Sequence, residues 1–559
     1  MSSKIFVNEY FVRIEAMSTD IAFQQLISNC PRIEKSRKRN EYFCSLELLP
    51  AVLHYLRGIN SYEECPDGFI KDKYKEVETR ETYTALLKQY GPTQTDEFLW
   101  PHQSLGVELA EVNKRYGFFY DTRTGKTLMS LKIMYNALKR NDAKRCLVVC
   151  QSSIIPTWVE DAKRYPELVL TTFYGKNKWE AIHKPAHIII WSMEQVLDNL
   201  ELLKAAKFDL CFVDESSKMK NHKSKISGAL LELSKTIPRW YLLSGTPAPN
   251  NESEYYVQMQ SIDPYCFPTA RSRFKERYFN DKSRDNRYEI LKLRNDKSEE
   301  FFNIISKYSI YVDQSVMPMA GKVWHKVYFD IADELKVTYN TMREEKLIEV
   351  EEHDLSAKLA ASVRSKLNQI SSGFIMDTDA IKFNKLLKKL QIPGNNTESY
   401  VLSDYRIQEL DKLIEHIGRD ERLIVWANFH EEFAMLENYF GPHARYLKGG
   451  VGQTYREDSI AAFKRGEVQH LVCHPQSVGL GINLAESHNA IYYSCSDSWE
   501  SLKQSSERIA GHISVQPHEC HYYVMIANDT VDELIYKNVS NKRDASFGLL
   551  EHLKAEALR

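Results

Sequence analysis

The sequence predicts an α/β protein built on two parallel sheets, with a small α+β unit before them and a helical interval between them. The first series of short apolar runs starts at about Phe98 and occupies residues 146–150, 188–191, 210–214 and 240–245. The second series begins near Tyr405, with runs at residues 423–427, 444–449, 470–474, 490–494 and 522–526. Because helical segments separate these runs, they are typical of parallel strands covered on both faces, with ligands beyond the carboxyl ends of the strands.

Composition narrows the class of protein. The chain has 559 residues, 43% hydrophobic and 27% charged, which is enough for several ordinary folded domains. A net charge of −2 excludes a polybasic surface over the whole chain, so any nucleic-acid surface must be local. Ten cysteines without a Cys-x-x-Cys pair argue against a zinc site or a disulfide framework. No apolar stretch approaches the ~18 residues of a membrane span, and no signal peptide is recognisable, so we expect an intracellular, cytoplasmic protein.

The N-terminal part is expected to be a unit of its own. Within residues 1–62, strand-like segments at 4–14 and 41–48 alternate with helical segments at 21–30 and 49–59. The basic run at residues 32–40 is either a solvated loop or the DNA-contacting part of an accessory domain. Residues 63–93 have the pattern of a helical linker with charged faces.

A phosphate-binding loop is predicted at Tyr116–Thr127, YGFFYDTRTGKT. Gly-Lys-Thr follows an apolar run and precedes a helical segment, so backbone N–H groups and the helix dipole would face an anion. Lys126 would reach the outer phosphates of a nucleotide, and the Thr127 hydroxyl would hold Mg²⁺. The full pattern asks for a glycine where Tyr120 stands, so the motif is degenerate at one end.

Two further motifs follow strands of the first series. In VDES (213–216), Asp214 would bind Mg²⁺ and Glu215 would orient and deprotonate the attacking water; the alternative is a solvated strand end. In LLSGTP (242–247), Ser244 and Thr246 would couple the nucleotide site to a bound polymer; the alternative is an ordinary turn.

The interval 266–400 is predicted to be helical and rich in basic and aromatic residues. Its cluster RSRFKERYF (271–279) either grips nucleic acid or is a solvated helix whose aromatic side chains face the core. The segment QIPGNNTES (391–399) is a predicted loop and hinge. In the second series, SVGLGINL (477–484) places two glycines where the backbone must approach another group closely.

Taken in order, these motifs resemble superfamily 2 helicases, and within them the Swi/Snf-like branch of duplex-DNA translocases, in its compact bacterial or phage form. The resemblance spans roughly Trp100 to Lys542 and is carried by WPHQSLGVELA, DTRTGKT, LVVCQSSIIPTWVEDAKRY, DESSKMKNHKSK, LLSGTPAPNN, FKRGEVQHLVCHPQSVGLGINL and QSSERIAGH. It implies two RecA-like lobes, at residues 94–265 and 401–559, joined by the helical insertion and linker at 266–400.

The resemblance also implies a bound ATP with Mg²⁺ and assigns residues to it. The implied catalytic residues are Lys126, Asp214, Glu215 and Arg508, and Thr127 and Asp214 are the implied metal ligands. The implied ATP contacts are Gln103, which matches the adenine-reading glutamine, and Thr124, Gly125, Lys126, Thr127, Gly479 and Gln504. The implied DNA contacts are Ser152, Ser153, Trp158, Lys220, Ser244, Thr246, Ser477 and Asn483.

The chain departs from the family pattern at three positions. The family carries two arginines three residues apart in its last motif; Arg508 fills the first place and Gly511 stands in the second. Because an arginine finger contributes about 10³–10⁵ in turnover, a site with one arginine would be slow or would use another donor such as His512. Arg123 replaces a common glycine in the phosphate loop, and Ser217 replaces a common histidine.

The sequence therefore predicts an ATP-dependent translocase on duplex or branched DNA, acting without sequence preference in replication, recombination or repair. The alternatives are an RNA helicase, the motor subunit of a larger DNA-processing or defence complex, and an inactive scaffold that kept the fold. In the second of these, the N-terminal unit would dock a protein partner.

Overall fold

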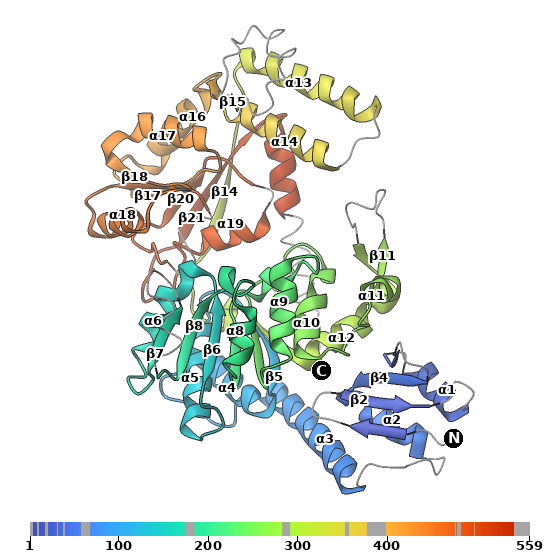
Figure 1. Cartoon of the computed structure of the whole chain (residues 1–559). Coiled ribbons are helices and arrows are strands. Elements are labelled where there is room, and N and C mark those ends of the chain that lie inside the picture. The colour runs from blue at the N-terminus through green and yellow to red at the C-terminus, as the bar shows by residue number, and fades with distance from the viewer. Residues whose placement is uncertain are drawn as a thin grey trace. The chain divides into compact units, whose positions relative to one another are not determined.

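The chain is described by a computed structural model over residues 4–7, 11–16, 21–30, 32–36, 40–57, 67–173, 185–281, 291–352, 357–376, 399–475, 477, 482–496 and 498–540. These residues fall into two compact units, one within residues 1–316 and one within residues 317–545 (Figure 1). Most of the predicted hinge at 391–399, and residues 37–39 of the basic run, lie outside the described residues. Among the described residues, no helix is both long and apolar enough to cross a membrane.

The first unit begins with a small α+β module. Its sheet has the order β1-β2-β4-β3 and is antiparallel, with strands β1 (Lys4–Val7), β2 (Phe11–Glu15), β3 (Glu34–Lys35) and β4 (Glu41–Ser45). Helices α1 (Ile21–Asn29) and α2 (Leu49–Arg57) bury Phe23, Leu26 and Val52 against this sheet. The strand-like segment 4–14 is therefore a pair of strands, in which Lys4 lies opposite Glu15.

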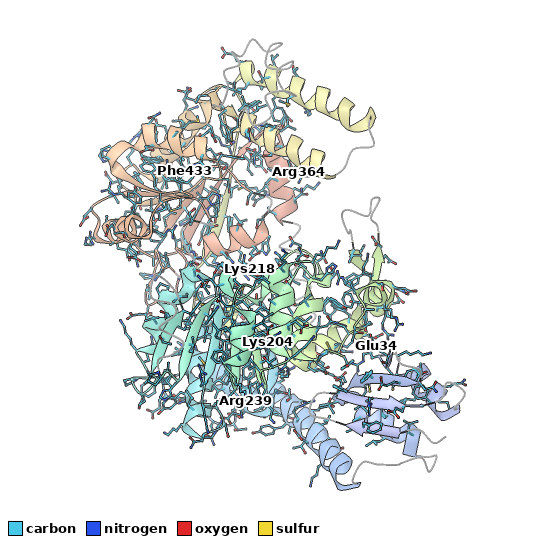
Figure 2. The ribbon with its side chains drawn as sticks, in the orientation of Figure 1. Glu34, Lys204, Lys218, Arg239, Arg364 and Phe433 are labelled. Atoms are coloured by element: carbon cyan, nitrogen blue, oxygen red, sulfur yellow. The ribbon has the colours of Figure 1, made fainter. Side chains whose placement is uncertain are left out.

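Polar and aromatic contacts join this module to the rest of the first unit. The carboxylate of Asp263 accepts hydrogen bonds from the hydroxyls of Ser45 and Tyr308, and burial raises the pKa of Asp263 above its ordinary value. Glu34, labelled in Figure 2, accepts from the backbone N–H and the hydroxyl of Thr269. The 24-residue helix α3 (Asp67–Tyr90) lies where the helical linker is predicted.

The main sheet of the first unit has seven parallel strands in the order β13-β5-β10-β9-β6-β8-β7. Its strands are β5 (Arg115–Tyr120), β6 (Cys146–Cys150), β7 (Leu170–Phe173), β8 (Ile188–Ser192), β9 (Leu210–Val213), β10 (Arg239–Leu243) and β13 (Ser309–Val312). The further helices of this unit are α4 (Pro101–Val112), α5 (Lys126–Lys139), α6 (Ile155–Ala162), α8 (Leu200–Ala205), α9 (Lys225–Ser234), α10 (Tyr255–Ile262), α11 (Arg271–Tyr278) and α12 (Ser298–Tyr308). Figure 2 labels Lys218 near the carboxyl end of this sheet and Arg239 at its amino end.

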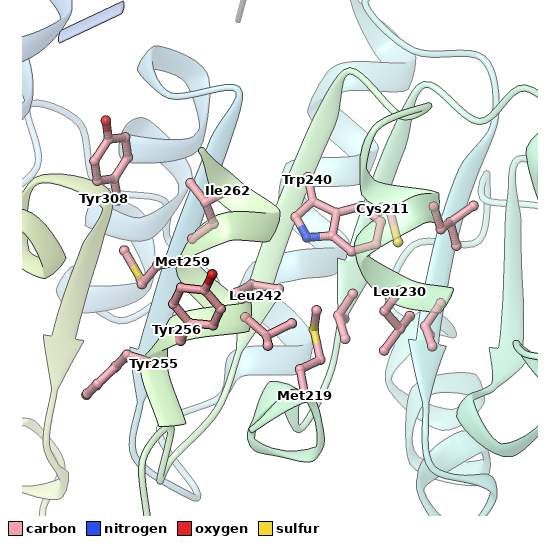
Figure 3. Packing of buried hydrophobic residues seen from close by; sticks show 14 of the residues in the cluster. Cys211, Met219, Leu230, Trp240, Leu242, Tyr255, Tyr256, Met259, Ile262 and Tyr308 are labelled. Atoms are coloured by element: carbon pink, nitrogen blue, oxygen red, sulfur yellow. The ribbon is translucent and has the colours of Figure 1, made fainter. Parts of the chain in front are cut away.

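Successive side chains of one strand contact helices on opposite faces of the sheet. Trp240 and Leu242 of β10 belong to the core cluster that includes Met259 of α10, whereas the hydroxyl of Tyr241, between them, donates to the Ala110 carbonyl of α4 at 2.9 Å. Figure 3 shows Trp240 and Leu242 together with α10 residues. Because successive side chains of a strand point to opposite faces, this one strand is buried on both sides.

The interval 266–400 contains strands as well as helices. Strand β13 joins the first sheet beside β5, and β14 (Lys322–Phe329) belongs to the sheet of the second unit. Two short antiparallel pairs also lie here, β11 (Phe279–Asp281) with β12 (Leu291–Leu293) and β15 (Phe374–Met376) with β16 (Ser399–Val401). In the basic-aromatic cluster, Phe274 and Tyr278 are buried in the core. This placement supports the interpretation of 271–279 as a helix with core-facing aromatic residues.

The second unit holds a six-stranded parallel sheet in the order β14-β21-β20-β17-β19-β18. Its other strands are β17 (Leu423–Trp426), β18 (Ala444–Leu447), β19 (His470–Cys473), β20 (Asn489–Tyr492) and β21 (Cys520–Ala527). Its helices are α13 (Asp333–Glu352), α14 (Ala357–Ser371), α16 (Tyr405–Ile417), α17 (His430–Phe440), α18 (Gln453–Arg465) and α19 (Trp499–Ser506). The predicted fold, two parallel α/β lobes with a small α+β unit, is confirmed.

Candidate functional site

The phosphate loop connects β5 to α5 at the carboxyl end of the first sheet. Gly125 is the residue before the first turn of α5 and has φ +78°, a conformation that side chains other than glycine rarely adopt. A Cβ at this position would collide with the side-chain amide of Gln103. The predicted glycine is therefore required twice, by the backbone and by the close approach of Gln103.

Hydrogen bonds between residues of the phosphate loop fix its backbone conformation. The Asp121 carbonyl accepts from the Thr124 hydroxyl at 2.6 Å and from Lys126 Nζ at 3.1 Å. Lys126 Nζ also donates to the Tyr120 carbonyl at 3.0 Å. The ammonium group thus lies at the start of a 14-residue helix, whose N-terminal N–H groups favour an anion. These residues fit a bound phosphate group.

Tyr120 explains why this loop does without the expected glycine. Its side chain is fully buried, and its hydroxyl donates to the His102 carbonyl of α4 at 2.7 Å. Only its backbone carbonyl faces Lys126, so any residue that fits the core would serve there. Three residues on, Arg123 has φ +62°, and a glycine would adopt this conformation without strain.

Gln103 lies against the loop, at the N-terminus of α4. Its amide nitrogen donates to the Gly125 carbonyl at 3.0 Å, and its amide oxygen accepts from the Trp100 backbone N–H at 2.9 Å. The structure therefore brings the predicted adenine-reading residue and the phosphate loop together.

The two acidic residues follow β9 at the same end of the sheet. Asp214 is buried; its Oδ2 accepts from the indole N–H of Trp158 at 2.9 Å and its Oδ1 from the Glu215 N–H at 3.0 Å. Burial raises the pKa of Asp214, and the positive charge of Lys126 together with these hydrogen bonds opposes that rise. Glu215 is also buried and has φ +54°, a strained backbone conformation of a kind that clusters at functional sites.

The SGTP loop, which we define as residues 244–247, lies against the phosphate loop. A Cβ on Gly245 would come within 3.2 Å of the Thr122 nitrogen and 3.4 Å of Asp121 Oδ1. The Ser244 hydroxyl, fully buried, accepts from the Thr246 N–H at 3.1 Å.

Two predicted DNA contacts are placed in the interior. Trp158 is fully buried and its indole N–H donates to Asp214, so the predicted DNA contact of its side chain finds no support in this structure. The buried hydroxyl of Ser244 likewise shapes the SGTP loop and is not exposed to a polymer. The hydroxyl of Ser152 bonds to Ser192 and Glu194, each at 2.9 Å. The predicted DNA contacts that keep exposed or partly exposed side chains are Ser152, Ser153, Lys220, Thr246, Ser477 and Asn483.

The second unit carries the remaining predicted residues. Arg508 has 8% of its surface exposed, and its guanidinium lies 3.5 Å from the Ile482 carbonyl. Gln504 of α19 is partly exposed, with its amide 3.4 Å from Glu500. Gly511 makes a backbone hydrogen bond, in which its carbonyl accepts from the Ala320 N–H at 2.9 Å. Gly479 lies outside the described residues.

Two glutamines at the site escaped prediction. Gln314, just after β13, donates its amide to the Thr122 carbonyl at 3.1 Å and to the Thr122 hydroxyl at 3.2 Å. Gln258 of α10 accepts from the Ser216 hydroxyl at 2.8 Å and donates to the Pro247 carbonyl at 2.7 Å. No local pattern marks either residue, since both reach the site only through the packing of distant segments.

Family models match two successive stretches of the chain. The SNF2-related domain matches residues 107–373, and the helicase conserved C-terminal domain matches residues 405–511.

Several curated relatives match over most of the chain. Protein p41 of Acyrthosiphon pisum secondary endosymbiont phage 1 is 24% identical over 485 residues, covering 81% of this chain and 98% of the phage protein. The DNA repair and recombination protein RAD54 of Saccharomyces cerevisiae is 22% identical and covers 88% of this chain. RDH54 of the same yeast, also described as a DNA repair and recombination protein, is 22% identical and covers 76% of this chain. The chain spans 59% of the length of RAD54 and 50% of RDH54.

Among solved structures, the Sulfolobus solfataricus SWI2/SNF2 ATPase core in complex with dsDNA is 21% identical, with a TM-score of 0.37. The match covers 85% of this chain and 98% of the Sulfolobus solfataricus chain.

Proposed function

The chain belongs to the Swi/Snf-like branch of the superfamily 2 helicases, a branch of DNA-dependent ATPases, and we propose that it uses ATP to move along duplex or branched DNA in replication, recombination or repair. The observation that carries the proposal is the carboxyl end of the first sheet. There, a phosphate-binding loop, a buried pair of acidic residues and the SGTP loop lie together.

The residues of the first unit divide the work on ATP. Lys126 would exchange the carbonyls of Tyr120 and Asp121 for phosphate oxygens, and the N–H groups of Thr124, Gly125 and Thr127 would bind the phosphates. Gln103 would read the adenine. Thr127 and Asp214 would hold Mg²⁺, which neutralises charge on the phosphates and polarises the bond that breaks. The buried carboxylate of Asp214 suits a cation, because a metal ion would offset the cost of burying its charge.

Glu215 is proposed to orient and deprotonate the attacking water. Its strained φ of +54° fixes the direction of the side chain, since few neighbouring conformations are open to it. From the second unit, Arg508 is proposed to contact the γ-phosphate when ATP is bound, with Gly479 and Gln504 as further contacts. Because Gly511 supplies no second arginine, turnover should be slow for this class of motor.

The DNA backbone is proposed to contact the polar residues that remain accessible on both units. In the first unit these are Ser152, Ser153, Lys220 and Thr246, and in the second Ser477 and Asn483. Cycles of ATP binding and hydrolysis would then advance the duplex, with the N-terminal module as a further DNA-contacting or partner-docking element.

ATP hydrolysis with different nucleic acids tests the proposal. We expect duplex or branched DNA to stimulate turnover well above single strands and RNA, and the substitution Glu215→Gln to abolish it. Strong stimulation by RNA alone would favour an RNA helicase. A turnover that Glu215→Gln leaves unchanged would come from a contaminant and would favour an inactive scaffold.

A further inference from the structure

A buried glutamine bridges two of the motifs at the first unit's site. Gln258 lies on α10 with no exposed surface. Its amide oxygen accepts from the Ser216 hydroxyl at 2.8 Å, and its amide nitrogen donates to the Pro247 carbonyl at 2.7 Å and to the Glu254 carbonyl at 3.1 Å. A side chain bound at both ends in the interior has little freedom to change rotamer, so the two segments that it joins must move together.

One end of this bridge fixes the proposed catalytic base. Ser216 follows Glu215 directly, and Asp214, on the other side, is anchored by Trp158. Glu215 is thus held between two anchored neighbours, which keeps its strained backbone in place. The next residue, Ser217, adds no second link, since within the described residues its buried hydroxyl has no hydrogen-bond partner.

The other end of the bridge fixes the SGTP loop. Pro247 is the last residue of this loop, whose Gly245 packs against Asp121 and Thr122 of the phosphate loop. Thr246, one residue before Pro247, keeps a partly exposed side chain. A polymer that displaces Thr246 would therefore pull on the carbonyl that Gln258 holds.

We propose that Gln258 is a positioning residue that couples DNA contact at the SGTP loop to the orientation of Glu215, through Pro247 on one side and Ser216 on the other. The inference rests on the proposed DNA-stimulated ATPase. It adds a specific route, in which the loop shift that DNA causes reaches the catalytic base through two hydrogen bonds of one side chain.

The test compares Gln258→Met with Gln260→Met. Methionine matches the volume of glutamine but makes neither hydrogen bond. Gln260, on the same helix and with 8% of its surface exposed, lies 3.5 Å from the Thr269 carbonyl, away from both motifs. We expect Gln258→Met to lower the ratio of turnover with duplex DNA to turnover without it by at least about fivefold, the lower end of ordinary coupling between two sites. Gln260→Met should keep the wild-type ratio, and KM for ATP should stay nearly constant, because Gln258 does not touch the phosphate loop.

Other outcomes separate the possible failures. A folded Gln258→Met protein with the wild-type stimulation ratio would overturn the inference, and so would an equal loss of basal and stimulated turnover. Wild-type protein that DNA does not stimulate would overturn the proposed function itself. If Gln258→Met does not fold, Ser216→Ala cuts the same bridge by removing one hydroxyl, and it should lower the ratio in the same way. An unchanged ratio in Ser216→Ala would then overturn the inference.

Discussion

Removing the indole N–H of Trp158 perturbs the proposed metal site by a single hydrogen bond. It donates to Asp214 Oδ2 at 2.9 Å, and both side chains are buried. Phenylalanine keeps most of the aromatic bulk and removes the donor. A hydrogen bond to a charged group contributes about 1.5–3 kcal/mol, and each 1.4 kcal/mol is about tenfold in an equilibrium or a rate. We therefore expect Trp158→Phe to lower kcat/KM for ATP by about 10- to 150-fold.

The pKa of Asp214 predicts how the pH–rate profile of Trp158→Phe differs from that of the wild type. Burial already raises the pKa of Asp214, and the Trp158 hydrogen bond is one of the contacts that oppose the rise by stabilising the ionised form. Without that bond the pKa of Asp214 should rise further. Because Asp214 must be ionised to hold a cation, the acid limb of the pH–rate profile should move to higher pH in Trp158→Phe. Raising the pH should then restore part of the lost activity.

A matched variant controls for the cost of shrinking a buried tryptophan. Trp191 is also buried and stacks on Phe173 with the ring centroids 3.5 Å apart. Within the described residues its indole nitrogen has no hydrogen-bond partner. Trp191→Phe should therefore cost stability but leave kcat/KM and the acid limb in place. If Trp158→Phe and Trp191→Phe have the same pH–rate profile and the same kcat/KM, the assigned role of Trp158 is refuted.

Three further predictions concern stability. Arg123→Gly should raise the free energy of unfolding by about 0.5–1 kcal/mol in denaturant titrations, because relief of the positive φ exceeds the added entropy of the unfolded chain; a lower value would contradict the strain. Burial lowers the pKa of His470 from 6.5 to about 4. The buried neutral imidazole therefore contributes fully to the free energy of unfolding above pH 6.5. This contribution is lost as the pH falls through about 4, which lowers the free energy of unfolding by about 3 kcal/mol. His470→Leu should flatten the fall of Tm between pH 7 and 4, whereas an unchanged fall would exclude this origin. Arg406→Met should cost about 3–5 kcal/mol in denaturant titrations, because it leaves Asp532, 2.9 Å from Arg406 Nη1, as a buried charge without its cation. A loss below about 1 kcal/mol would contradict this role of the ion pair.

The strands that the sequence predicts are those with a continuous apolar run. β6, with the sequence CLVVC, is buried along its whole length, and β17, with LIVW, is as well. A central parallel strand is covered on both faces, so its sequence marks it directly. β13 and β14 each lie at an edge of a sheet, and β14 has mostly exposed or half-buried residues. Its sequence KVWHKVYF therefore lacks the apolar run, and only its pairing with β21 identifies it as a strand.

Some residues of the candidate site belong to short local motifs, whereas others reach it only by contacts with residues far away in the sequence. Gly125, Lys126, Asp214 and Glu215 belong to short motifs whose backbone geometry is set locally, and the sequence marks them. Gln258 lies 42 residues from its partner Ser216. Gln314 lies 192 residues from its partner Thr122, so sequence spacing carries no sign of either contact. The family resemblance assigns Trp158 to DNA, whereas α6 buries it on one face with Ile155 and Ala162, where its indole N–H donates to Asp214.

Movement along a duplex is measured most directly by displacement of the third strand from a DNA triplex, which requires translocation but no strand separation of the duplex. Wild-type protein should displace the third strand when ATP is present, and neither wild type without ATP nor Glu215→Gln with ATP should do so. Wild-type protein that hydrolyses ATP on the same DNA and leaves the triplex intact would contradict the proposal that this chain is a translocase.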